Sequence, residues 1–272
     1  MWKGNPLTPK RLKELSSELE IFGYTSVLLP FHSHNSDYLI KSAAALIPGN
    51  KLKYMIALRP YHISPQFCAM IAEAYNQIDP DRLIFNWIAG DFDVRDDEPD
   101  QVDVFGMSET IDSITKRTTF LRNFVKQYNS YPLLSNRPEM VFSGFSDYTL
   151  DTVKIFDETS LSMIDDYRSN INKFKGINKK MVSVNPIILD DNVEKYKEKI
   201  FSVNPRSPNT TIIGNKESVK KQILELKNEG ITDVLLYTSR PEVLQFRDPL
   251  NHKNDILVNE LVKEILKGEN NV

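Results

Sequence analysis

The stretch from Lys51 to Asp91 reads KLKYMIALRP YHISPQFCAMIAEAYNQIDPD RLIFNWIAGD, and it decides the fold of this chain. Two short apolar runs, at 53–58 and 83–89, predict β-strands. Between them, Ser64 and Pro65 predict the start of a helix, because serine caps helix N-termini and proline fits the first helical turn. Strand, helix and strand in this order form a βαβ unit. Such a unit implies a parallel sheet covered by helices.

The alternation of strands and helices continues along the rest of the chain. Further strands are predicted at 25–30, 140–142, 161–164, 180–189 and 232–237, with a short extended piece at 210–213. Helices are predicted at 9–22, 38–47, 108–128, 148–156, 167–174, 192–201, 218–229 and 255–266. The acidic segment 91–103 has no periodicity, and we expect it to form a loop.

About seven strands alternating with helices favour an α/β fold of the (β/α)8 TIM-barrel type, with a doubly wound open sheet as the alternative. We expect a single barrel domain over residues 1–272. Only Met1 to Pro6 precedes the first predicted helix, and Asn5-Pro6 interrupts any strand there. The first strand of the barrel is therefore expected to be missing or very short, or to be supplied by another chain.

Composition is that of an ordinary globular protein, with 40% hydrophobic and 26% charged residues. The net charge of −3 gives no reason to expect nucleic acid or an anionic membrane as partner. The one cysteine, Cys68, excludes an intramolecular disulfide, suits a reducing compartment and is expected to fill the core. No apolar run is long enough to cross a membrane. We therefore expect a cytoplasmic protein.

Several segments resemble the bacterial-luciferase-like flavin monooxygenases, and most closely their alkanesulfonate monooxygenase branch. They are GYTSVLLP at 23–30, KLKYMIALRPYHISP at 51–65 and DRLIFNWIAGD at 81–91. The segment IIGNKESVKKQILELKNEGITDVLLY at 212–237 resembles the closing helix and strand of that family. The resemblance covers most of residues 10–240.

The resemblance implies a (β/α)8 barrel that forms a homodimer. It implies that reduced FMN, supplied by a separate flavin reductase, binds at the carboxyl ends of the strands and uses O2 to oxidise a small organic substrate. A related branch of the family uses the deazaflavin coenzyme F420 for hydride transfer. The cofactor expected here is accordingly reduced FMN, with F420 as the alternative.

Candidate site residues lie where strands end, because a parallel barrel gathers its active site at the carboxyl ends of its strands. The candidates for holding the cofactor are Arg59, Asn86, Ala89, Gly90, Ser143 and Ser146. Ser146 precedes a predicted helix, so it either binds the flavin phosphate, as the family resemblance implies, or simply caps that helix. Asn86 either contacts the flavin or is a satisfied amide in the core.

Three histidines follow two of the predicted strands. His32 and His34 come after the strand at 25–30, and His62 comes after the strand at 53–58. A histidine beside a flavin can act as a general acid or base near neutral pH, so these three are the candidate catalytic residues. The alternative is that they are solvated loop residues.

Two other classes of function stay open. A His-x-His pair at a strand end is also typical of zinc-dependent barrel hydrolases, in which His62, His252, Asp91 or Asp93 would complete the ligand set. A non-catalytic binding or structural barrel is the other alternative. It is favoured by Asn35, Val184 and Pro186, which occupy positions where the resemblance to the sulfonate branch implies cysteine, arginine and histidine.

Overall fold

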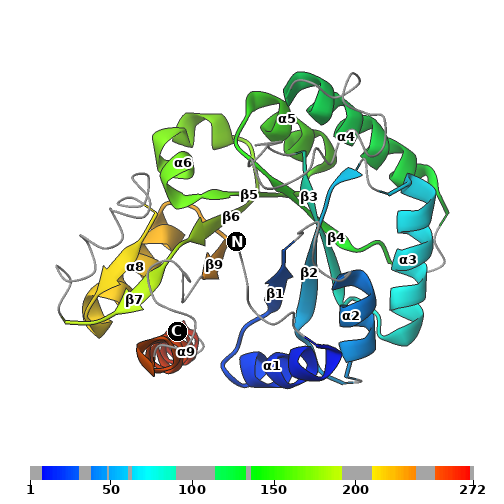
Figure 1. Cartoon of the computed structure of the whole chain (residues 1–272). Helices are drawn as coiled ribbons and strands as arrows, with labels where there is room; N and C mark the ends of the chain where they lie inside the picture. Colours follow the sequence, from blue (N-terminus) through cyan, green and yellow to red (C-terminus); the bar gives the residue numbers. More distant parts are fainter. Residues whose placement is uncertain are drawn as a thin grey trace, which may run out of the picture.

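Seven parallel strands curl around a common centre, with helices on the outside of the curve (Figure 1). The computed structural model describes residues 8–30, 38–47, 49–60, 63–89, 114–132, 136–191, 210–236 and 249–269. The strands are β1 (Ser26–Leu29), β2 (Lys53–Leu58), β3 (Leu83–Ile88), β4 (Glu139–Ser143), β5 (Thr159–Met163), β6 (Lys179–Val184) and β9 (Asp233–Leu236). They pair in chain order without the reversal of a doubly wound sheet. The predicted barrel-type fold is confirmed.

The helices alternate with these strands, as predicted. They are α1 (Pro9–Ile21), α2 (Tyr38–Ala45), α3 (Pro65–Ile78), α4 (Ile114–Ser130), α5 (Asp147–Phe156), α6 (Ile164–Ser169), the 3-10 helix η3 (Ile171–Phe174), α8 (Lys216–Asn228) and α9 (Pro249–Glu269). Thr8, Ser64, Ser146 and Asn215 cap four of them by accepting a backbone N–H three residues on. Within the described ranges, none of the helices combines the length and apolarity needed to cross a membrane.

The sheet does not close into a full ring in the described part of the chain, where β1 pairs only with β2 and β9 only with β6. Figure 1 shows α1 and α9 beside this opening. The Tyr24 hydroxyl donates a 2.9 Å hydrogen bond to Asn259 of α9. Gly23 has a φ of +90°, and a Cβ there would lie 2.6 Å from Leu266, so glycine permits the close approach of α9. The expectation of a missing or very short first strand concerns residues 1–6, which lie outside the described residues.

Two predicted elements were wrong in their extent. The helix predicted at Tyr167–Phe174 is instead α6 followed by η3, because Asn170 leaves helical geometry and its side-chain amide bonds the Asp166 carbonyl at 2.9 Å. The predictions for 108–113 and 192–201 lie outside the described residues.

The strand predicted at Lys180–Leu189 is two strands in two sheets. After β6, the cis peptide bond Asn185–Pro186 redirects the chain into β7 (Ile187–Leu189). β7 then pairs in parallel with β8 (Ile212–Gly214). Proline has no backbone N–H to extend a ladder, which is why the continuous apolar pattern does not make one strand.

The strands bury both faces, and their side chains alternate between them. Outward-facing aromatic residues such as Phe85, Trp87 and Phe142 pack under the helices, and the Trp87 ring lies 5.0 Å from that of Phe124 in α4. Inward-facing residues form a separate apolar cluster, made of Met55, Ile84, Val141 and Leu161, with Leu28, Met181 and Leu235 half-buried at its edge.

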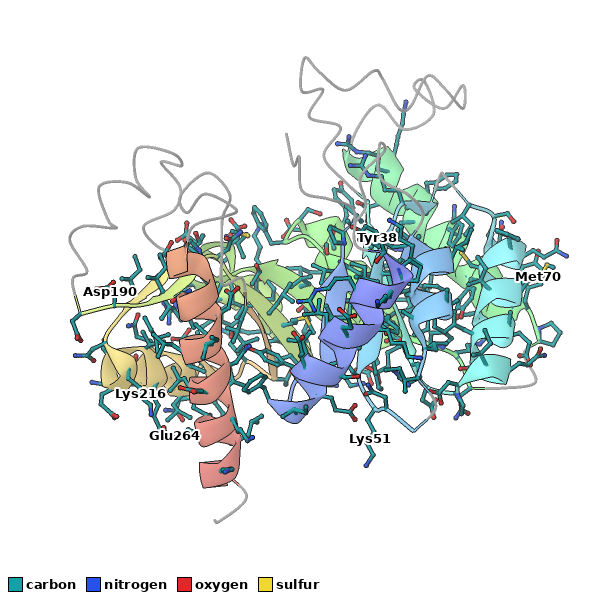
Figure 2. The ribbon with its side chains drawn as sticks, turned by 60° about the horizontal axis from the view of Figure 1, so that its bottom comes forward. Tyr38, Lys51, Met70, Asp190, Lys216 and Glu264 are labelled. Carbon is teal, nitrogen blue, oxygen red and sulfur yellow. The ribbon has the colours of Figure 1, made fainter. Side chains whose placement is uncertain are left out.

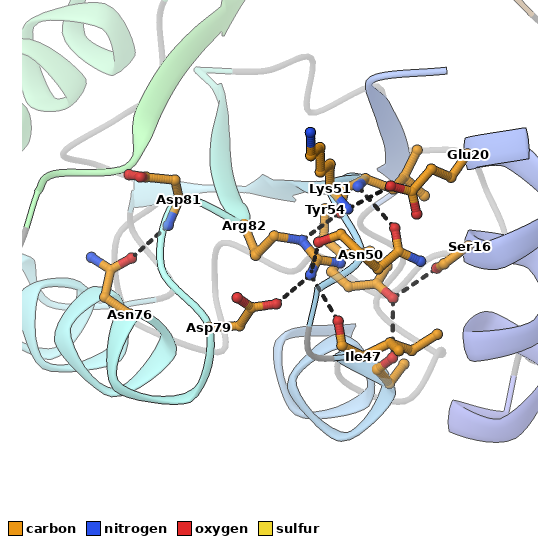
Figure 3. Close-up of polar contacts among 12 residues, drawn as sticks. Ser16, Glu20, Ile47, Asn50, Lys51, Tyr54, Asn76, Asp79, Asp81 and Arg82 are labelled. Atoms are coloured by element: carbon orange, nitrogen blue, oxygen red, sulfur yellow. Dashed lines mark hydrogen bonds and ion pairs between the residues drawn. The ribbon is translucent and has the colours of Figure 1, made fainter. Parts of the chain in front are cut away.

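Arg82 joins two connecting segments at the amino ends of the strands (Figure 3). It is 3% exposed, and its guanidinium donates to the carbonyls of Leu52 and Asn50, each at 2.7 Å, and of Ile47 at 3.2 Å. It also forms an ion pair with Asp79, the residue that ends α3. One side chain therefore fixes the α2–β2 connection against the α3–β3 connection.

Charged pairs also join α8 to α9. Figure 2 shows Lys216 and Glu264 facing each other across these helices, and the Lys220 ammonium lies 2.8 Å from the Glu264 carboxylate. The two lysines hold the pKa of Glu264 at about 2, well below its ordinary value. The pairs are exposed to solvent and set the register of the two helices rather than supplying much stability.

Candidate functional site

Inward-facing side chains change character along the strands. The middle layer is the apolar cluster of Met55, Ile84, Val141 and Leu161. Two residues further toward the carboxyl ends, strand alternation places a layer with small or polar members. Its members are Ala57, Asn86, Ser143, Met163 and Ser183. Since parallel strands all point the same way, this layer lies at the carboxyl mouth of the curled sheet.

The polar centre of this layer is a pair formed by Asn86 of β3 and Ser143 of β4. The Ser143 hydroxyl donates a 2.7 Å hydrogen bond to the Asn86 side-chain carbonyl. Asn86 is only 2% exposed, whereas Ser143 is half-buried. Among the described residues, the Asn86 amide N–H2 group has no acceptor. Two hydrogen-bond donors are thus held in place at the mouth.

Ser146 lies at the start of α5, one turn beyond Ser143. Its hydroxyl accepts the Thr149 N–H at 3.2 Å and lies 2.9 Å from the Thr149 hydroxyl, so it caps the helix. Asp147 follows directly and pairs with Lys173 at 3.1 Å. A phosphate bound at this helix N-terminus would lie close to the Asp147 carboxylate. The capping role of Ser146 is therefore observed, and the phosphate-binding role stays a prediction.

The other predicted cofactor residues lie in different surroundings. Arg59 follows β2 at the mouth and is half-buried. Ala89 is 2% exposed in the cluster between the sheet and the helices, so its side chain faces away from the mouth. Gly90 lies outside the described residues.

The predicted catalytic histidines, His32, His34 and His62, also lie outside the described residues, as does Asn35. Within the ranges that are described, no three histidine, cysteine, aspartate or glutamate side chains gather to hold a metal ion. Cys68 is fully buried in α3, as predicted for a core residue, and burial raises the pKa of its thiol to about 12. It is therefore not an activated nucleophile.

The amino end of the interior is charged, in contrast to the mouth. Lys53 and Glu139, both inward-facing, form an ion pair there. Nearby, Glu158 begins the approach to β5, and its carboxylate accepts the Met140 N–H at 3.3 Å. Burial raises the pKa of Glu158 to about 7, and Glu139 and Asp157 add to the shift while Lys179 opposes it.

Known structures share this architecture, although no family model matches the sequence. The oxygenating constituent of 3,6-diketocamphane monooxygenase from Pseudomonas putida, solved with FMN, aligns with a TM-score of 0.69 at 12% identity, over 97% of this chain and 95% of that one. A long-chain alkane monooxygenase aligns at 0.69 and 11% identity, over 96% and 84%. The coenzyme F420 dependent tetrahydromethanopterin reductase from Methanopyrus kandleri aligns at 0.61 and 14%, over 93% and 94%.

The chain shares the barrel-type fold of these proteins. These two alignments cover nearly the whole of the known structure as well as of this chain, so the similarity concerns the entire architecture rather than one βαβ unit. At these identities the likeness establishes the fold, and the chemistry has to come from the site itself.

Sequence reasoning missed three members of the mouth layer, Ala57, Met163 and Ser183. The signal that could have found them is strand alternation, because each lies two residues beyond an inward apolar residue: Met55, Leu161 or Met181. It also missed the role of Arg82, whose acceptors come from a segment about thirty residues away. Local periodicity carries no signal for such a contact.

Proposed function

We propose that this protein is a flavin-dependent oxidoreductase that uses reduced FMN and O2 on a small organic substrate, with coenzyme F420 as the alternative cofactor. The observation that carries the proposal is the Asn86 amide. It is buried at the mouth with its carbonyl bonded to Ser143 and with no acceptor for its N–H2 group among the described residues.

The residues present fit an isoalloxazine-type ring. Such a ring has an apolar face and carbonyl and nitrogen acceptors at its edge. The apolar layer of Met55, Ile84 and Val141 provides a floor, and Asn86 provides donors for the edge. Trp87, the largest buried side chain of β3, packs against Phe124 on the helix side of the sheet rather than on its inner side. When bound, the cofactor supplies the redox chemistry, while this chain binds it, orients it and excludes water.

The sequence most closely resembles the alkanesulfonate monooxygenases, which would suggest a sulfonate as substrate. We do not extend the proposal to a sulfonate, because of two residues. Val184 is fully buried in the cluster between sheet and helices, and Pro186 is also buried, at the cis bond that leads out of the sheet. Neither offers a charge to a sulfonate, so the proposed substrate class stays a small organic molecule.

The test is a titration of FMN, reduced FMN under anaerobic conditions, and F420 with the purified protein, followed by flavin fluorescence and absorption. We expect saturable binding of at least one of them, with a changed spectrum. Absence of binding at millimolar cofactor would leave the non-catalytic barrel as the better proposal. Stoichiometric zinc in an elemental analysis would favour the hydrolase.

We further propose that the partner is a second copy of this chain, docked on α3. Phe67, Met70 and Ile78 of α3 are 53%, 59% and 57% exposed, and Figure 2 shows Met70 on its outer side. With Ile71 and Ala74 they form a seam at the spacing of paired helices. In an antiparallel two-fold pair the same face of each subunit meets its copy, so one apolar seam can serve both partners.

The size of this face suits a dimer. α3 spans about 21 Å, and α2 beside it exposes Ile40, so the apolar face extends beyond one helix. We expect wild-type protein to elute and scatter light as a dimer, and Phe67→Lys with Met70→Lys to yield monomer. Ile155→Lys, at an equally exposed position on α5, is the matched control and should remain dimeric. A monomeric wild type would exclude this partner.

The remaining expectations follow from the same proposal. A luciferase-like enzyme that uses reduced FMN needs an electron source, so we propose a separate flavin reductase as a transient partner. The free, buried Cys68 is compatible with the cytoplasm, where we propose that the protein works.

A further inference from the structure

We propose that Ser143 is a positioning residue, which fixes the orientation of the Asn86 amide and so makes the mouth a donor site for a carbonyl-bearing ring. The inference rests on the proposed flavin-binding function and deepens it. It gives Ser143 a role different from the direct cofactor contact that the sequence suggests.

The first step is the placement of the two side chains. In the β3–β4 ladder, Asn86 is opposite Val141 and Ser143 is opposite Ile88. Asn86 and Ser143 both face inward, with Ser143 one step nearer the carboxyl edge. Its hydroxyl reaches back to donate a 2.7 Å hydrogen bond to the Asn86 carbonyl oxygen. Because Asn86 is only 2% exposed, this hydrogen bond is shielded from competing water.

The second step is the chemistry of the amide. An asparagine side chain has one acceptor oxygen and two N–H donors, and a rotation about its last bond exchanges them. A hydroxyl bonded to the oxygen selects one orientation and directs the N–H2 group elsewhere. Ser143 is thus the group that decides which end of the amide a ligand meets.

The third step is the unmet donor capacity. Within the described ranges, the Asn86 N–H2 group donates to no protein acceptor, although the residue is only 2% exposed. A ligand that brings a carbonyl or ring-nitrogen acceptor into the mouth would supply one. The isoalloxazine and deazaflavin rings both have such acceptors on one edge, so the ligand class is a planar ring with an acceptor edge rather than a cation or a donor-rich sugar.

The experiment compares Asn86→Ala, Asn86→Asp, Ser143→Ala and Ser143→Thr by the dissociation constant of oxidised FMN and the visible spectrum of bound FMN, with the melting temperature as a check of folding. We expect Asn86→Ala to weaken binding roughly tenfold or more, the loss of one or two buried hydrogen bonds. Ser143→Ala should weaken it roughly fivefold and remove the spectral shift, because the amide loses its fixed orientation. Ser143→Thr keeps a hydroxyl and should restore both.

The control is Ser162→Ala, which removes a buried serine hydroxyl of β5. Ser162 lies on the outer face of the sheet, which the helices cover, and not on the inner face that carries Asn86 and Ser143. It should change neither the dissociation constant nor the spectrum. Asn86→Asp accepts the same bond from Ser143 but has no N–H2 group, so it should bind FMN at least as weakly as Asn86→Ala.

The outcomes separate this inference from the function on which it rests. Suppose that wild-type protein binds FMN, and that Ser143→Ala changes neither the dissociation constant of FMN nor the visible spectrum of bound FMN. The positioning role is then wrong, while the flavin proposal stands. If Ser143→Ala fails to fold, wild-type affinity in Asn86→Asp overturns the inference, because the donors would then be dispensable. If wild-type protein binds none of the cofactors, the proposed function fails first, and this inference with it.

Discussion

Replacing Arg82 with alanine should lower the free energy of unfolding by about 3–5 kcal/mol, the typical cost of removing one partner of a buried ion pair. The loss leaves the Asp79 carboxylate without its cation, and the carbonyls of Leu52 and Asn50 without their 2.7 Å donors. Urea unfolding followed by circular dichroism measures the change. Arg82→Lys should recover part of the loss, since an ammonium cannot reach all of these acceptors in the geometry of a guanidinium.

The matched control for this measurement is Arg11→Ala. Arg11 also pairs with two carboxylates, those of Glu14 and Glu18, at 3.3 and 3.2 Å, but its side chain is half-exposed on α1. Its loss should cost less than about 1 kcal/mol, as for other surface pairs. Equal effects of the two substitutions would show that Arg82 does not hold the two connections together.

Glu158→Gln should stabilise the protein at pH 8 by about 1–2 kcal/mol and change its stability much less at pH 5. Burial raises the pKa of Glu158 to about 7 in the folded protein, from an ordinary 4.5. The folded state then binds more protons than the unfolded state between these values. Stability contributed by this group is therefore present in acid, falls as the pH rises from about 4.5 to 7, and stays lost above that.

The size of this effect is set by partial solvent access. The full shift of the pKa would correspond to about 3 kcal/mol, and screening of the half-buried carboxylate reduces it to the stated range. Glutamine keeps an oxygen to accept the Met140 N–H. Urea midpoints at both pH values measure the difference, with Asp151→Asn on the exposed side of α5 as control. A pH-independent effect of Glu158→Gln would contradict the assignment.

Much of the architecture could be read from local pattern. The strands at 53–58 and 83–88 and the helix that begins after Ser64 are where the sequence predicts them. These elements are specified by neighbours in the chain: apolar runs for buried parallel strands, and a serine followed by proline for a helix start. The order of the strands follows as well, because right-handed βαβ connections place successive strands side by side.

The candidate site could be predicted only in part. Strand ends mark where a site lies, and Asn86 and Ser143 were both found in this way. The sequence could not show that they touch, because 57 positions separate them and only the register of β3 with β4 brings them together. Nor could it show that Ala89 faces the helices, since the orientation of a residue at a strand end depends on where the pairing begins.

The sequence by itself determined the class of this protein: alternating strands and helices, parallel pairing and a polar edge where the strands end, because each depends on residues a few positions apart. The tertiary structure alone decided the break at Pro186, the role of Arg82 and the pairing of Asn86 with Ser143. Each of these depends on the distance between atoms of remote segments. Such distances arise only when the packed sheet sets its register and curvature, and no local pattern encodes them.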